Sequence, residues 1–256
     1  MLLEPTIEKL VQMKLYGMAE SLKSRLSRSD HADLSHADLF GLVVDDEWTH
    51  REKKRMEVLL RMAAFKDAAC LEDVDYRQER NLKKAAILEL GQNAWIEQKQ
   101  NLVLIGPTGA GKSYLSQALG NKACRDGYSV LYFRMSKFLM RLKTARLEGS
   151  YTLFLKRLSK ARVVVLDDFG LDLIEEQAIR DFLEMLDDRQ GVGSVILTTQ
   201  LPVSDWHEYL GGGIIADSIC DRLLSSSQRI ELNSKESMRK PKAGLTKKRE
   251  EAQTES

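Results

Sequence analysis

Residues 102–119, LVLIGPTGAGKSYLSQAL, combine a short apolar run, a glycine-rich turn and a segment with the apolar spacing of a helix. The turn fits the pattern G-x-x-x-x-G-K-S over residues 106–113. Between a strand and a helix, such glycines let backbone N–H groups converge on phosphate oxygens, and the helix N-terminus adds partial positive charge. The stretch therefore predicts a phosphate-binding loop. The alternative is a glycine turn with a purely structural use.

Besides the backbone N–H groups of the loop, two side chains offer specific chemistry toward a nucleotide. Lys112 can neutralise the β- and γ-phosphates of ATP, and the Ser113 hydroxyl can ligate Mg²⁺. The sequence thus predicts ATP and Mg²⁺ as ligands. The residues expected to bind the nucleotide are Gly106, Pro107, Thr108, Gly109, Ala110, Gly111, Lys112 and Ser113.

A second motif, VVVLDDFG, follows at residues 163–170. Four apolar residues predict a buried strand that ends in two carboxylates. An acid at the carboxyl end of a parallel strand beside the loop is well placed to hold Mg²⁺. We therefore expect Asp167 to be the metal-binding acid and Asp168 to orient or polarise the attacking water. The alternative is that both acids cap a strand where it enters a turn.

The order of the remaining elements indicates the fold class. Short β-rich runs occur at residues 101–105, 129–133, 163–166, 194–199 and 229–232, with helical segments between them. Several of these runs are apolar without alternation, which is typical of strands buried on both faces of a parallel sheet. We predict an α/β fold in which helices flank a parallel sheet.

The N-terminal part of the chain lacks strand signals. Apolar residues recur with helical spacing from residue 6 to about 26, and a second helix is expected from Ser35 to Phe65, with Asp38 completing a capping box. We predict a small all-α module over residues 1–75, which provides partner or oligomer contacts, and an α/β domain over 76–245. Residues 246–256 have no apolar periodicity, and we expect a disordered tail.

Composition argues against a membrane-spanning protein and against a metal site built from cysteines. The 256 residues are 43% hydrophobic and 30% charged, and no apolar run approaches the ~20 residues of a membrane helix. The three cysteines are scattered without metal-ligand spacing, which favours a reducing cytoplasm.

The net charge of +1 conceals three charged blocks. Residues 136–162 carry eight Lys or Arg and one Glu, residues 167–188 carry nine acids and one Arg, and residues 235–251 carry seven bases and three acids. Such blocks suggest separate surfaces for separate partners, and the alternative is solvated helix faces.

Taken together, these motifs resemble the IstB-type branch of the AAA+ ATPases, the helper ATPases of insertion-sequence transposition, which are related to DnaC helicase loaders and DnaA initiators. The resemblance rests on the loop, on VVVLDDFG, on ILTTQLPVSDW and on IADSICDRLL with RIELNSKESMRK. EKLVQMKLYGMAESL and LVVDDEWTHREKKRMEVLLRMAAF also look like the helical N-terminal region of the family. The similarity spans residues 7 to about 240 and implies an AAA+ P-loop fold.

The resemblance also implies roles for individual residues. Gln200 matches the sensor 1 position, commonly an Asn, and Arg222 in CDRLL matches the arginine finger that reaches a neighbouring subunit's ATP. A surface arginine is the alternative for Arg222. Two departures stand out: Asp168 replaces the usual glutamate, so hydrolysis could be slow, and Arg239 is the one sensor 2 candidate.

The family likeness gives the basic block a place beside the DNA path of an oligomer. Positive side chains there would neutralise phosphates without reading bases. The residues expected to contact DNA are Lys137, Arg141, Lys143 and Arg146. An alternative is that they pair with the acidic block of a neighbouring subunit.

The implied function is an ATP-hydrolysing homo-oligomer with ATP at its subunit interfaces. It would assemble on double-stranded DNA with little sequence preference and recruit or activate a transposase for transposition and DNA recombination. The alternatives are a DnaC-like helicase loader and a non-hydrolysing ATP-dependent DNA scaffold.

Overall fold

The computed structural model describes residues 3–27, 35–76 and 81–233, and the chain divides into two compact units, Met1–Arg61 and Met62–Ser256. The tail predicted over residues 246–256 and Arg239 lie outside the described residues. None of the helices in the described ranges is long and apolar enough to cross a membrane.

Unit 1 is built from α1 (Leu3–Gln12), α2 (Tyr16–Ser27) and most of α3 (His36–Ala63). The prediction of one continuous helix from residue 6 to 26 is wrong. Lys14 adopts a left-handed conformation (φ 61°), and the Leu15 N–H bonds back to the Leu10 carbonyl, which ends α1. The capping box before α3 is confirmed, because the Asp38 N–H donates to Ser35 Oγ at 3.1 Å.

The contact between α2 and α3 is close and partly charged. A Cβ atom at Gly17 would stand 2.7 Å from the Glu47 Cα atom, so only glycine lets the two backbones approach this far. The buried Glu47 carboxylate accepts the Met18 N–H at 3.1 Å and pairs with Arg51 at 2.6 Å. The first turn of α2 is thus satisfied by a side chain from α3.

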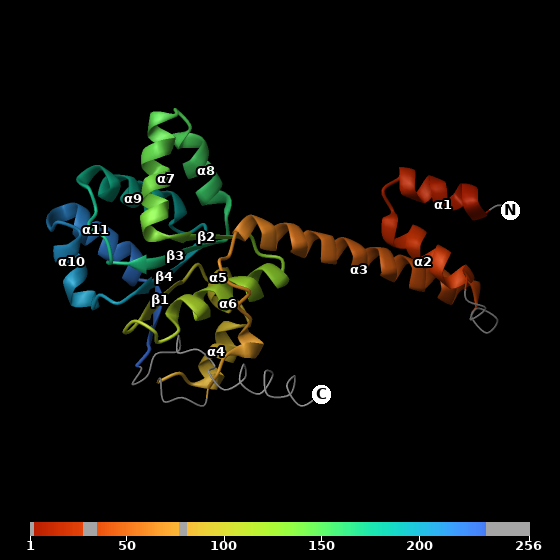
Figure 1. The fold of residues 1–256 in the computed structure, drawn as a ribbon, viewed down its shortest axis with the longest axis horizontal. Coiled ribbons are helices and arrows are strands. Elements are labelled where there is room, and N and C mark those ends of the chain that lie inside the picture. The colour runs from red at the N-terminus through yellow and green to blue at the C-terminus, as the bar shows by residue number, and fades with distance from the viewer. Residues whose placement is uncertain (1–2, 28–34, 77–80, 234–256) are drawn as a thin grey trace, which may run out of the picture. The chain divides into compact units, whose positions relative to one another are not determined.

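Unit 2 contains a five-stranded parallel sheet in the order β2-β3-β4-β1-β5 (Figure 1). The strands are β1 (Asn101–Ile105), β2 (Val130–Arg134), β3 (Val163–Phe169), β4 (Ser194–Thr199) and β5 (Ser227–Glu231). The predicted α/β class and the parallel sheet are confirmed. The predicted run at 229–232 starts two residues and ends one residue later than β5. The sequence also ended β3 at residue 166, whereas β3 continues through the two acids.

Helices cover both faces of the sheet (Figure 1). One face packs on α6 (Lys112–Arg125), which follows β1. The opposite face carries the hydrophobic core cluster, which includes Val103, Val164, Leu166, Val195 and Leu197 from alternate strand positions. The helices that close over it are α7 (Met135–Leu147), α8 (Tyr151–Lys160), α9 (Glu176–Arg189), α10 (Trp206–Tyr209) and α11 (Gly213–Leu224).

Unit 2 begins earlier than the domain boundary predicted near residue 75. The segment after α3 packs on α6: a Cβ atom at Gly120 would stand 2.8 Å from the Phe65 ring, and the Cys70 N–H donates to the Tyr114 hydroxyl at 3.4 Å. These contacts assign residues 62–75 to unit 2. The short 3₁₀ helix η1 (Leu71–Asp73), α4 (Lys84–Leu90) and α5 (Ala94–Glu97) lead into β1, and η2 (Val203–Asp205) follows β4.

Candidate functional site

The glycine-rich loop joins β1 to α6 at the carboxyl edge of the sheet. Gly106 has a φ of 156°, and a Cβ atom there would stand 2.2 Å from the Leu232 carbonyl oxygen, so the position requires glycine. Gly111 is left-handed (φ 92°) and caps α6, whose first residues are Lys112 and Ser113. The Lys112 ammonium donates to the carbonyls of Gly106 and Pro107 at 2.7 and 2.9 Å. The loop thus holds its lysine folded over the turn.

Asp167 is fixed by hydrogen bonds from the two strands that flank β3. Its carboxylate is buried, with 2% of the residue exposed. It accepts the Tyr132 hydroxyl from β2 at 2.8 Å and the Thr198 hydroxyl from β4 at 2.5 Å. Burial and the neighbouring Asp167 raise the pKa of Tyr132, so this hydroxyl remains a donor.

Asp168 has a different environment. Its backbone is left-handed (φ 67°), and the pairing of β3 with β4 is irregular between Leu166 and Phe169. Its carboxylate pairs with Arg134 at the end of β2, with Nη2 at 2.7 Å and Nε at 3.1 Å. The side chain expected to act on water is therefore held by a guanidinium in this structure.

Gln200 lies directly beyond β4 and contacts the loop. Its Oε1 accepts the Thr108 hydroxyl at 2.6 Å. A polar amide thus stands beside the glycine-rich turn, at the position that the family resemblance matches to sensor 1.

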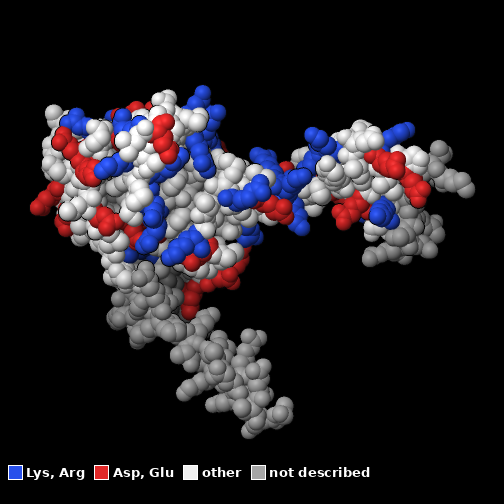
Figure 2. All heavy atoms as spheres, turned by 45° about the horizontal axis from the view of Figure 1, so that its top comes forward, with Lys and Arg blue, Asp and Glu red and all other residues white. Residues whose placement is uncertain are grey.

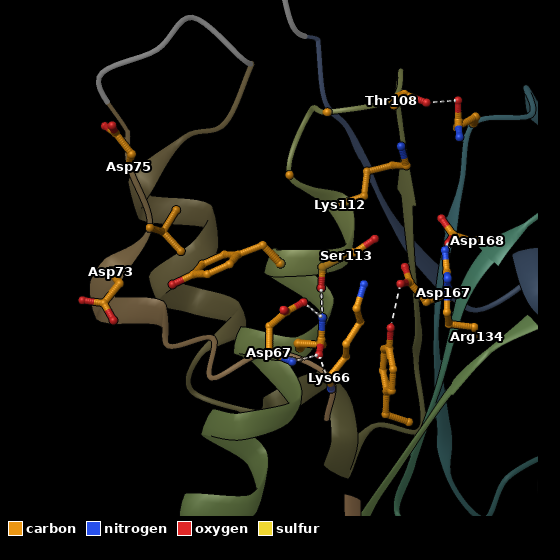
Figure 3. A pocket seen from close by; sticks show the side chains of 17 residues that line it. Lys66, Asp67, Asp73, Asp75, Thr108, Lys112, Ser113, Arg134, Asp167 and Asp168 are labelled. Atoms are coloured by element: carbon orange, nitrogen blue, oxygen red, sulfur yellow. Dashed lines mark hydrogen bonds and ion pairs between the residues drawn. The ribbon is translucent and has the colours of Figure 1, made fainter. Parts of the chain in front are cut away.

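These side chains surround one pocket of about 960 Å³ (Figure 3). Sequence reasoning missed several residues that build it, because Tyr132, Arg134 and Thr198 reach the site only through strand neighbours that a single sequence does not reveal. Other unforeseen lining residues, Lys66 and Asp67, come from the segment after α3.

The donor set fits a nucleotide with Mg²⁺. Ser113, Asp167 and Asp168 line the pocket together with Lys112, Gly109 and Gly111. The other predicted loop residues, Gly106, Pro107 and Ala110, are not among its lining residues. The described residues contain no cluster of three or more His, Cys, Asp or Glu able to hold a metal by themselves. Mg²⁺ commonly uses one or two protein oxygens and completes its shell with water and substrate phosphates, which is what Ser113 and Asp167 would require.

Arg222 lies away from this pocket. Its carbonyl accepts the Asn101 side-chain amide at 2.9 Å, at the amino end of β1, whereas the loop follows the carboxyl end. Five strand residues separate the two ends by roughly 13 Å. The Arg222 guanidinium pairs with Asp187 of α9 and donates to the Ser218 carbonyl. The arrangement gives Arg222 no contact with the nucleotide site of its own chain.

The expected DNA-contacting residues lie on α7, and three of the four have acidic partners in the same chain. Arg146 forms a bidentate ion pair with the buried Asp181. Lys143 pairs with Glu175, and Arg141 Nη1 lies 3.4 Å from Glu148 Oε2. Lys137 is exposed and has no ion pair within the described ranges. Lys143 and Arg146 thus pair with the acidic block of the same chain, whereas the partner of Arg141, Glu148, belongs to the basic block itself.

Two solved structures that share this fold are those of DnaA and of the DnaC helicase loader. AMPPCP-bound DnaA from Aquifex aeolicus aligns with a TM-score of 0.57 and 20% identity over 69% of this chain and 53% of the DnaA chain. The DnaC helicase loader aligns with a TM-score of 0.55 and 20% identity over 64% of this chain and 96% of its own. This likeness establishes the AAA+ fold.

Closer relatives come from insertion sequences. The chain is 44% identical to the putative insertion sequence ATP-binding protein y4pL of Sinorhizobium fredii, over 94% of this chain and 98% of the relative. It is 30% identical to the IS21 putative ATP-binding protein of Pseudomonas aeruginosa, over 93% of this chain and 91% of the relative. The model of the IstB-like ATP binding protein family matches residues 8–246. With its P-loop, its paired aspartates and this near full-length match, the chain belongs to the family of IstB-like ATP binding proteins.

Proposed function

We propose that this protein is an ATP hydrolase of an insertion sequence, which binds ATP and Mg²⁺, assembles on duplex DNA and recruits or activates a transposase. The observation that carries the proposal is the pocket in which Lys112, Ser113, Asp167 and Asp168 converge at the carboxyl edge of the sheet. The insertion-sequence context comes from the names of the relatives.

The chemistry follows from these groups. Bound Mg²⁺ would supply charge neutralisation at the β- and γ-phosphates, held by Ser113 and Asp167. The Lys112 ammonium would exchange its two loop carbonyls for phosphate oxygens. Asp168 would accept a proton from the attacking water, which requires that Arg134 release its carboxylate. Gln200 would hold the water or the γ-phosphate.

In a homo-oligomer, a neighbouring subunit would supply a further cation to the phosphates of each bound ATP. Because Arg222 makes no contact with its own pocket, we infer that it acts on the ATP of a neighbouring subunit, where a cation stabilises the charge that develops in the transition state. Its pair with Asp187 would have to open in that assembly.

The DNA-contacting surface that we propose differs from the predicted one. Arg141, Lys143 and Arg146 have acidic partners in the chain, whereas α8 carries three exposed cations without an ion pair in the described residues: Lys156, Arg157 and Lys160. Figure 2 shows Lys and Arg side chains on the part of unit 2 from which α7 and α8 project. Unpaired cations neutralise DNA phosphates without first breaking a pair, so we infer that α8 and Lys137 contact the backbone.

Two measurements test the proposal. Lys112→Ala should abolish binding of a fluorescent ATP analogue and ATP-dependent assembly, and unchanged affinity would refute the nucleotide site. Replacing the three α8 cations by Gln should weaken binding to unrelated duplexes equally and reduce the slope of log affinity against log salt by roughly 0.9 for each DNA phosphate that is no longer neutralised. The matched control is Arg141→Gln with Lys143→Gln, which should leave the slope unchanged.

A second function is favoured by the Arg134 contact. If Arg134 never releases Asp168, the protein would be an ATP-dependent DNA scaffold that binds but does not hydrolyse ATP. Steady-state phosphate release with and without DNA separates the two, since the scaffold gives no turnover in either condition.

A further inference from the structure

Hydrogen bonds hold the segment at residues 66–67 against α6, the helix that carries Ser113. The backbone N–H groups of both residues donate to Gln117 Oε1 on α6, at 2.8 and 2.9 Å. The Gln117 amide nitrogen donates in turn to Asp67 Oδ2 and to the Ser113 carbonyl, each at 3.1 Å. Gln117 is 1% exposed. A buried side chain one turn below Ser113 therefore fixes the backbone of this segment.

The preceding residue anchors the segment on its other side. The Phe65 ring lies over Gly120 of α6, and its centroid is 6.2 Å from that of Tyr132, whose hydroxyl binds Asp167. With its backbone held on both sides, Lys66 extends its side chain into the pocket toward Ser113 and Asp167 (Figure 3).

The three cations that line the pocket, Lys66, Lys112 and Arg134, differ in their partners. Lys112 is bound to loop carbonyls and Arg134 to Asp168. For Lys66, no ion pair or side-chain hydrogen bond exists within the described part of the chain. An ammonium held at a fixed backbone and aimed beside two predicted metal ligands, without a carboxylate of its own, fits an anionic ligand better than a structural role.

We propose that Lys66 is a second phosphate-binding lysine, whose ammonium contacts the β- and γ-phosphate oxygens of the nucleotide on the side of Ser113 and Asp167. The proposal rests on the nucleotide site proposed above. Lys112 approaches the phosphates from the loop and Lys66 from the opposite wall. Because Lys66 and a divalent cation neutralise the same oxygens, the lysine should matter most when no metal is present.

The test is the affinity of the full chain for fluorescent ATP and ADP analogues, measured in Mg²⁺ and in EDTA. Lys66→Gln should weaken ATP binding about tenfold in EDTA, as expected for a charge-assisted contact, and less in Mg²⁺. ADP should lose less affinity than ATP. Lys66→Arg should retain part of the affinity. As a control, Lys83→Gln removes the same charge from an exposed site outside the pocket and should leave the affinity for both analogues unchanged.

Gln117→Leu provides a second test of the clamp. It leaves the Lys66 charge in place but releases its backbone, so its effect on ATP affinity should not add to that of Lys66→Gln. Thermal unfolding should be unaffected by Lys66→Gln, since the substitution removes no ion pair among the described residues.

Two results overturn the assignment. One is wild-type ATP affinity of Lys66→Gln in EDTA. The other is an equal loss of affinity for ATP and ADP with a lowered unfolding temperature, which would make Lys66 structural. If Lys112→Ala also bound ATP normally, the proposed site itself would fail, and the two failures are thus distinguishable.

Discussion

Arg146→Ala should destabilise the protein, because Arg146 neutralises a buried carboxylate. Its guanidinium binds both Asp181 oxygens, at 2.5 to 3.0 Å, and its central carbon lies 3.8 Å from the Tyr151 ring centroid. The Asp181 side chain is 3% exposed, while that of Arg146 is 41% exposed. Removing one partner of a fully buried pair costs about 3–5 kcal/mol, and the exposure of Arg146 reduces this to about 2–3 kcal/mol.

The expected fall in unfolding temperature is about 4–12 °C for a unit of this size. Burial raises the pKa of Asp181, but hydrogen bonds from Arg146 and Gln177 outweigh burial and hold it below its ordinary value. The stabilisation is therefore present above the unfolded-state pKa of about 4 and is lost as pH falls through the folded-state value. The difference between wild type and variant should shrink accordingly in acid.

Calorimetry at pH 7 and at a pH well below 4 measures both effects, with Lys143→Ala as the control. Lys143 and Glu175 are both well exposed, so their pair should contribute less than about 1 kcal/mol. Wild-type stability of Arg146→Ala, together with a reduced salt slope for DNA binding, would refute the reasoning and return Arg146 to the DNA surface.

Three further substitutions test the site. Asp168→Asn should retain ATP binding but stop phosphate release, and wild-type turnover would exclude it as the water-activating acid. Arg134→Ala should raise ATP hydrolysis without DNA, since it frees Asp168; a rate at or below the wild-type value argues against restraint by Arg134. Arg222→Ala should leave monomer ATP affinity intact and abolish hydrolysis, and mixing it with Lys112→Ala should restore some phosphate release if the site is shared between subunits.

The sequence predicts the sheet well where strands are buried on both faces. The apolar runs at residues 101–105 and 194–199 coincide with β1 and β4, which lie in the interior of the sheet. The edge strand β5 is less apolar and has no buried residue, so the sequence gives a weaker signal for where it begins and ends. The break at Lys14 has no signal in the apolar spacing, because the periodicity continues through it.

Charge pairing was not predictable in the same way. The basic block at 136–162 and the acidic block at 167–188 suggest separate partners, yet Arg146 and Lys143 pair with acids at or just before α9. Those pairs depend on how α7 packs beside α9, since Arg146 and Asp181 are 35 positions apart in the sequence. Sequence identifies the charges but does not indicate which of them remain unpaired after folding.

Local backbone geometry gives the two adjacent aspartates different environments. In a regular strand, consecutive side chains point to opposite faces, so only one carboxylate would reach the pocket. The irregular pairing after Leu166 and the left-handed Asp168 redirect the chain, and both carboxylates line the pocket. Thr198 links them, because its hydroxyl accepts the Asp168 N–H at 3.0 Å and donates to Asp167. The Asp167 carboxylate is thereby buried among neutral donors, an environment in which it could bind a metal. The Asp168 carboxylate instead pairs with the half-exposed Arg134, and this ion pair could open to let Asp168 bind another group. The two roles that we propose for these chemically identical residues would follow from this irregularity of the strand.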